Sequence, residues 1–122
     1  MLKGPALIAF CCPAVPVEGL ALSVNEIVAQ AYLYVDRGWA VIPLREGGIL
    51  PAESDWPNRG ARSRPAVDVA WQINPGANLG IITGRLSGFW VLDIDPGNGG
   101  EKALAGLVQA FGRLPDTYTV DT

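Results

Sequence analysis

The sequence predicts an α/β domain of the α+β type, in which a mixed sheet is flanked by helices. Two long stretches carry apolar residues at helical spacing, and they end at Gly38 and at Gly112. Short runs rich in β-branched and aromatic residues alternate with these stretches and are bounded by glycine, proline or asparagine. The chain has 122 residues, 49% of them hydrophobic, which suits one domain with its own core.

The composition excludes several classes of protein. A net charge of −3 does not fit a basic protein that coats nucleic acid. Because the sequence contains no histidine, it holds neither a Ser-His-Asp triad nor a histidine-ligated zinc site. The two cysteines, Cys11 and Cys12, are adjacent, a spacing that disfavours a disulfide. No apolar run is long enough to span a membrane. We therefore expect a reduced, cytoplasmic protein with no membrane partner.

Residues 1–22 differ from the rest of the chain, because their apolar run is short and is interrupted by prolines. We expect them to be an N-terminal extension without fixed structure. Ser23 and Glu26 then have the spacing of a capping box, which predicts that a helix begins there. The domain is therefore expected to span residues 23–122.

The first half of this domain is predicted to contain a helix, a strand, a loop and a second helix. Residues 39–44 are typical of a buried strand, and residues 45–64 are rich in glycine, proline and polar residues, as in a long loop. Ser63 is placed to begin a short helix, in which Val67 and Trp71 share one apolar face.

The second half is predicted to contain a hairpin, a helix and a final strand. Residues 79–83 and 89–95 are close enough in sequence to form an antiparallel hairpin. Asn98 is the expected N-cap of the next helix, and residues 117–121 alternate as a strand does. That helix carries an apolar stripe expected to lie in the core: Leu104, Leu107, Val108 and Phe111.

Two aspartates end the apolar run 89–95. If this run is a strand, Asp93 and Asp95 point to the same side, about 7 Å apart, while Ile94 points the other way. Two carboxylates on the same side of a strand repel each other and resist ionising together, and a divalent cation between them removes that cost. Oxygen ligands suit Mg²⁺ or Mn²⁺. Asp93 and Asp95 are therefore candidate metal ligands.

The pattern D-x-D alone leaves other interpretations open. Aspartate often ends a strand, and Asp95-Pro96-Gly97-Asn98 is also good turn chemistry. Metal-dependent phosphatases of the haloacid-dehalogenase type and nucleotide-sugar glycosyltransferases use D-x-D as well. In the phosphatases the motif is commonly followed by threonine or valine, where Pro96 stands here.

Several short motifs follow one another in a definite order. They are Gly38, Val41–Leu44, Pro51 with Trp56, Trp71, Asn78–Gly84, Ser87-Gly88, Val91–Asp95 and Leu114–Thr117. In this order and spacing the chain resembles the bifunctional primase-polymerase (prim-pol) domain of the archaeo-eukaryotic primase superfamily. That family occurs mainly in replication proteins of phages, plasmids and other mobile elements.

The resemblance implies a nucleotidyltransferase of DNA replication with an RRM-like catalytic sheet. Asp93 and Asp95 would be catalytic, as two of three carboxylates that hold Mg²⁺ or Mn²⁺. The substrates would be NTPs or dNTPs, and the template would be single-stranded DNA. A helicase, fused or associated, would be a further partner.

The chain also departs from the family pattern. Ile49-Leu50 stands where the family often has a lysine. The chain ends at Thr122, before the histidine motif and the third carboxylate of the family. We therefore expect an N-terminal part of a prim-pol domain that is inactive by itself. A non-catalytic remnant that binds single-stranded DNA is the alternative.

Four arginines are candidates for contact with nucleic acid or nucleotide. Arg59, Arg62 and Arg64 lie close together in the long loop, where they could contact template phosphates or simply be solvated. Arg85 lies in the turn of the predicted hairpin.

Overall fold

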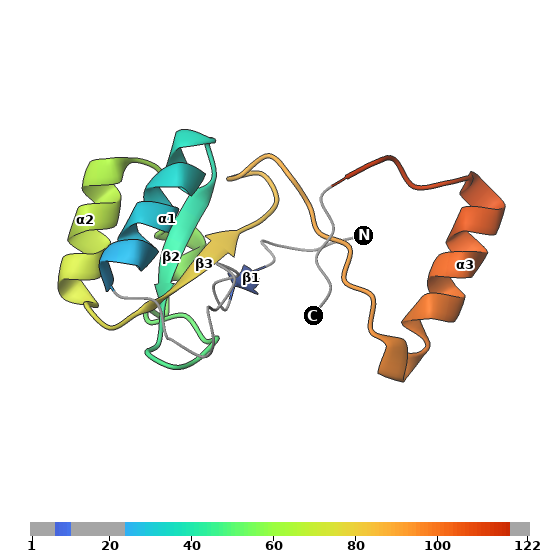
Figure 1. Ribbon diagram of the computed structural model, residues 1–122, viewed down its shortest axis with the longest axis horizontal. Coiled ribbons are helices and arrows are strands. Elements are labelled where there is room, and N and C mark those ends of the chain that lie inside the picture. The colour runs from blue at the N-terminus through green and yellow to red at the C-terminus, as the bar shows by residue number, and fades with distance from the viewer. Residues whose placement is uncertain (1–6, 11–23, 118–122) are drawn as a thin grey trace. The chain divides into compact units, whose positions relative to one another are not determined.

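The computed structural model describes residues 7–10 and 24–117, and divides the chain into two units, Met1–Val91 and Leu92–Thr122 (Figure 1). The described elements of the first unit are β1 (Leu7–Phe10), α1 (Val24–Asp36), β2 (Ala40–Leu44), the 3₁₀ helix η1 (Trp56–Asn58), α2 (Arg64–Ile73) and β3 (Asn78–Ile82). Those of the second unit are the 3₁₀ helix η2 (Pro96–Asn98) and α3 (Gly100–Phe111). The α+β class predicted from the sequence is confirmed.

The sheet of the first unit has three strands in the order β1-β3-β2, so β3 is central. Both neighbours pair with β3 in antiparallel fashion: Ala40 lies opposite Ile82 on one side, and Leu7 lies opposite the same residue on the other. The predicted strands 39–44 and 79–83 are thereby confirmed, each to within one residue.

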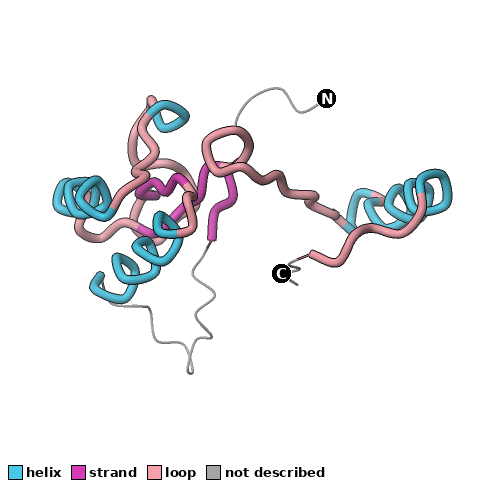
Figure 2. Tube along the Cα trace, turned by 90° about the horizontal axis from the view of Figure 1, so that it is seen from above, coloured by secondary structure: helices cyan, strands magenta, loops and turns pink. Residues whose placement is uncertain are grey.

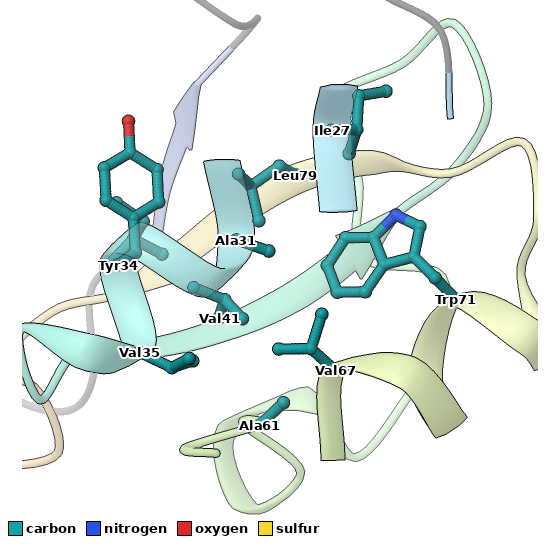
Figure 3. Close-up of a cluster of buried hydrophobic side chains, with 10 residues drawn as sticks. Ile27, Ala31, Tyr34, Val35, Val41, Ala61, Val67, Trp71 and Leu79 are labelled. Atoms are coloured by element: carbon teal, nitrogen blue, oxygen red, sulfur yellow. The ribbon is translucent and has the colours of Figure 1, made fainter. Parts of the chain in front are cut away.

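Helices α1 and α2 cover one face of this sheet. Side chains of a strand alternate between the two faces, so Val41, Leu79 and Ile81 point to the same side. There they pack with the apolar faces of the two helices into a buried cluster (Figure 3). The helix residues of this cluster are Ile27, Ala31, Tyr34, Val35, Val67 and Trp71.

The other face of the sheet is covered by residues of η1 and of the loops. Ala40, Ile42, Leu44 and Ile82 form a second buried cluster, against which Trp56 and Leu86 pack. A Cβ atom on Gly60, in the long loop, would lie only 2.8 Å from Ile82 Cδ1 and 2.9 Å from Ala40 Cβ. The loop can therefore approach the sheet closely because a glycine stands at this position.

Local signals predicted the first two helices well. The cap of α2 is confirmed, because Ser63 Oγ accepts a hydrogen bond from the Ala66 amide at 3.4 Å. Gly38 has a φ of 85° and follows α1 as a C′ glycine should. The predicted N-cap of α1, Ser23, lies outside the described residues.

Residues Leu7–Phe10 form strand β1, although they belong to a segment expected to lie outside the fold. The four residues pair with β3 along the edge that β2 leaves open. Their short apolar run, LIAF, suits a strand once such an edge is available.

The predicted strand 89–95 is not present. Beyond Ile82 the only strand-like pairing described is a bridge between Gly84 and Phe89, whose amide-to-carbonyl distance is 2.6 Å. The chain then continues as loop toward η2 (Figure 2). Residues 90–95 have no strand neighbour among the described residues, and an isolated pair of short strands is marginal in water. Of the predicted final strand, Thr117 is not in a strand, and residues 118–122 lie outside the described part.

Helix α3 differs from its prediction in two respects. Its N-cap is Gly99, in the left-handed region, while Asn98 belongs to η2. Its apolar stripe is not buried: the exposed fractions are 49% for Leu107, 36% for Val108 and 85% for Phe111. Among the described residues of α3 none is buried. None of the helices described here has both the length and the apolar character that a membrane crossing demands.

Candidate active site

Both candidate acids lie in the second unit, in the segment that leads into η2. Asp93 and Asp95 are exposed, while Ile94 between them is half-buried. Asp95 is the N-cap residue of η2. Asp93 forms no hydrogen bond or ion pair within the described ranges 7–10 and 24–117.

The carboxylate of Asp95 is held by its own turn. Its Oδ1 accepts a hydrogen bond from the Gly97 amide at 2.9 Å, and its Oδ2 accepts one from Asn98 Nδ2. Its backbone carbonyl accepts hydrogen bonds from the amides of Asn98 at 3.2 Å and of Gly100 at 2.9 Å. Asp95 therefore sits at the centre of a closed turn that ends where α3 begins.

Residues 93–95 do not form a strand, so strand alternation does not place the two acids on one side as predicted. Only one residue separates the carboxylates in sequence, so they still belong to one short segment. One carboxylate is fixed by hydrogen bonds, and the other is free to turn.

The two acids fit part of a ligand set for a hard cation. Carboxylate oxygens suit Mg²⁺, which is commonly bound through one or two carboxylates and completes its shell with water and phosphate oxygens. Within the described residues no group of three or more Asp, Glu, His or Cys side chains could hold a metal ion. Asp93 and Asp95 would thus supply two ligands of a set.

The candidate arginines of the first unit differ in how they are bound. Arg59 is exposed and makes two long ion pairs, 3.7 Å to Glu53 and 3.8 Å to Asp55. Arg62 and Arg85 are exposed and pair with no acid among the residues that the structure describes.

Arg64 is engaged in joining α1 to α2. Its guanidinium donates to both carboxylate oxygens of Asp36, at 3.2 and 2.5 Å, and lies over the Tyr32 ring at 5.0 Å. The hydrogen bonds from Arg64 lower the pKa of Asp36 below its ordinary value. The Tyr32 hydroxyl donates to Asp68, and this hydrogen bond raises the pKa of Tyr32. Arg64 therefore already has a partner within the fold.

Ser87, noted from the sequence as part of a Ser-Gly motif and not as a site residue, joins two strands at the end of the sheet. Its buried hydroxyl accepts a hydrogen bond from the Ala40 amide at 2.8 Å and donates one to the Ile82 carbonyl. It thereby links the start of β2 to the end of β3. Phe89, two residues later, packs on Trp39 with ring centroids 4.8 Å apart. These contacts hold the segment that follows β3 against the sheet. The only signal in the sequence was its place in a Ser-Gly motif.

One family comparison identifies the chain. Residues 31–122 match the family described as bifunctional DNA primase/polymerase, N-terminal. The match covers most of the chain and includes both aspartates and all four candidate arginines, so the chain belongs to this family. No curated protein and no solved structure matches it. The resemblance stated from the sequence motifs is confirmed.

Proposed function

We propose that this chain is the N-terminal part of a primase-polymerase that makes nucleic-acid primers and extends them on single-stranded DNA. The observation that carries the proposal is the family match over residues 31–122, which includes the exposed pair Asp93 and Asp95. A metal-dependent phosphatase or glycosyltransferase would share only the D-x-D pattern, whereas the family match involves the motifs before and after it.

In this proposal Asp93 and Asp95 hold Mg²⁺ or Mn²⁺ together with the triphosphate of an incoming NTP or dNTP. The cation, when bound, stabilises negative charge on the phosphate oxygens and helps to align an attacking hydroxyl. The chain's own contribution is to present two carboxylates at a defined place. Asp95 does so from a closed turn, and Asp93 from an exposed position where it can adjust. No nucleophile from the protein is required.

The fewer ion pairs an arginine makes within the fold, the more we expect it to contribute to phosphate binding. Arg62 and Arg85 are exposed and unpaired among the described residues, so each can neutralise a phosphate. Arg59 would first have to leave two weak ion pairs. Arg64 would have to give up Asp36, so we expect it to contribute least. A helicase partner, a phage or plasmid origin and a cytoplasmic location belong to the same proposal and rest on the family alone.

We further propose that these 122 residues are inactive by themselves. The family uses a histidine motif and a third carboxylate after the L-P-x-T motif, and the chain contains no histidine. A transfer site needs its groups in fixed geometry, and small misplacements can reduce the rate about 100-fold. If the alternative of a non-catalytic DNA-binding remnant holds, a protein containing the chain would bind single-stranded DNA without incorporating nucleotides.

The test is template-dependent incorporation of labelled nucleotides by a protein that contains the chain. We expect Asp93→Ala and Asp95→Ala each to reduce incorporation by about 100-fold or more, because each removes a proposed ligand. Asp116→Ala is the matched control, since Asp116 is exposed and, within the described residues, its one ion pair is with Arg113 at the surface. Undiminished incorporation by Asp95→Ala would refute the assignment of the site.

A further inference from the structure

The turn that holds Asp95 uses a different donor for each carboxylate oxygen. The Gly97 amide binds Oδ1, and the Asn98 side chain binds Oδ2. A carboxylate oxygen can accept more than one hydrogen bond or ligand, so each oxygen keeps a free direction. The two donors therefore fix the plane of the carboxylate without using up its capacity to bind a cation.

A second turn in the chain has the same Asp-x-x-Asn spacing and lacks this arrangement. In η1 the Asn58 side chain donates to Asp55 Oδ1 at 2.8 Å. No backbone amide of η1 is capped by the Asp55 side chain, and its other oxygen lies 3.8 Å from the Arg59 guanidinium. The asparagine alone is thus a common turn device. Asp95 differs from Asp55 because each of its two carboxylate oxygens accepts a hydrogen bond within the turn.

The backbone of the Asp95 turn also depends on Gly100. A Cβ atom on Gly100 would lie 2.7 Å from both the backbone nitrogen and the carbonyl oxygen of Asp95. Those are backbone atoms of the turn itself, so a side chain at position 100 would push the turn open. Gly106, further along α3, has no atom within 4 Å of such a Cβ and provides a matched comparison.

We infer that Asn98 is a positioning residue: it orients the Asp95 carboxylate toward a divalent cation, and the close approach of Gly100 keeps the turn shut. This inference rests on the proposed function, because it concerns the same metal ligands. Hydrogen bonds to a ligating carboxylate orient it, and losing such a partner typically lowers metal affinity 10- to 100-fold. Asn98 itself does not contact the cation.

The experiment compares Asn98→Ala and Gly100→Ala with the controls Asn58→Ala and Gly106→Ala. Mn²⁺ affinity of the 122-residue chain is measured by the EPR signal of free Mn²⁺. The χ1 rotamer of Asp95 without metal is measured by NMR coupling constants. We expect both test variants to weaken Mn²⁺ binding about 10-fold or more and to average the rotamer. We expect both controls to match the unsubstituted chain.

The outcomes separate the inference from the function on which it rests. Unchanged Mn²⁺ affinity in Asn98→Ala, with binding by the unsubstituted chain that Asp95→Asn abolishes, would overturn the positioning role and leave the metal site standing. Absence of Asp95-dependent binding in the unsubstituted chain would refute the proposed function, and the inference with it. If the χ1 angle of Asp95 already averages over several rotamers in the unsubstituted chain, the turn does not orient the carboxylate and the inference is wrong. Amide and Cα shifts of α3 report whether each variant keeps its helix.

Discussion

Helices α2 and α3 carry similar apolar patterns and have different fates. In α2, Val67 and Trp71 are four residues apart and are 0% and 3% exposed. In α3, Leu107 and Phe111 have the same spacing and are 49% and 85% exposed. The spacing of apolar residues therefore predicts which face a helix would bury, and says nothing of whether a partner is present. In this chain the packed core lies in the first unit, while the candidate acids lie in the second.

This difference means that stability and candidate chemistry can be changed separately. Substitutions in the core of the first unit should affect unfolding strongly. Substitutions in the described part of the second unit should affect unfolding little, and those around Asp95 should affect metal binding.

The largest effect is expected from matched aromatic truncations. Trp71→Ala removes a buried ring and its hydrogen bond from Nε1 to the Ala77 carbonyl at 3.2 Å. We expect it to lower the free energy of unfolding by about 3–5 kcal/mol. Phe111→Ala should change it by no more than about 0.5 kcal/mol, because the ring is exposed. Denaturant unfolding measures both, and equal losses would show that the stripe of α3 is packed in solution.

A smaller effect is expected at the junction between the sheet and the acidic segment. Ser87→Ala leaves the buried Ala40 amide without its acceptor, which should cost about 1–3 kcal/mol. Ser63→Ala, which removes the exposed cap of α2, should cost about 1 kcal/mol. Hydrogen exchange of the Ala40 amide provides a direct readout. If it stays as protected in Ser87→Ala as in the unsubstituted chain, Ser87 does not link the two strands.

The smallest effect is expected from pH, through the surface cluster that joins α1 to α2. The pKa of Asp36 is lowered by its hydrogen bonds from Arg64, so the folded state favours the ionised carboxylate. The stability that this carboxylate adds to the folded state is present above its ordinary pKa of 3.8. It is lost as the pH falls through the lowered pKa. The raised pKa of Tyr32 matters at alkaline pH, because the folded state favours the protonated hydroxyl. The stability that it adds is lost as the pH rises beyond 10.0 and through the raised pKa.

Thermal midpoints across the pH range check both signs. Asp36→Asn should reduce the fall of the thermal midpoint at acid pH, and Tyr32→Phe should reduce its fall at alkaline pH. Because Asp36 and Arg64 are exposed, the change on the acid side should be modest and should shrink in high salt. If the thermal midpoint falls at acid pH as much in Asp36→Asn as in the unsubstituted chain, the ion pair with Arg64 does not stabilise the fold.

Much of the fold could be predicted because its signals are local. Ser63 capped its helix as expected, and the strands 39–44 and 79–83 followed from their apolar, β-branched runs. The errors arose where a long-range partner decides. Leu7–Phe10 became a strand because β3 offers an edge, and 89–95 did not because no neighbour is present among the described residues.

The candidate site shows the same division. Asp93 and Asp95 were singled out by their D-x-D motif, and their role as metal ligands remains a prediction. The hydrogen bonds of Ser87 and Asn98 could not be predicted, because they depend on which backbone and carboxylate groups the fold brings to these side chains. The engagement of Arg64 with Asp36, 28 residues away in sequence, was likewise beyond any local pattern.

In the proposed function, Asp93 and Asp95 bind the divalent cation of a nucleotidyl-transfer site. The most direct test is NMR of the 122-residue chain with substoichiometric Mn²⁺. We expect the strongest broadening at residues 93–97, and we expect Asp93→Asn/Asp95→Asn to abolish it while Asp36→Asn leaves it unchanged. Broadening spread evenly over all acidic residues, or persisting in the double variant, would show that Asp93 and Asp95 do not form a metal site.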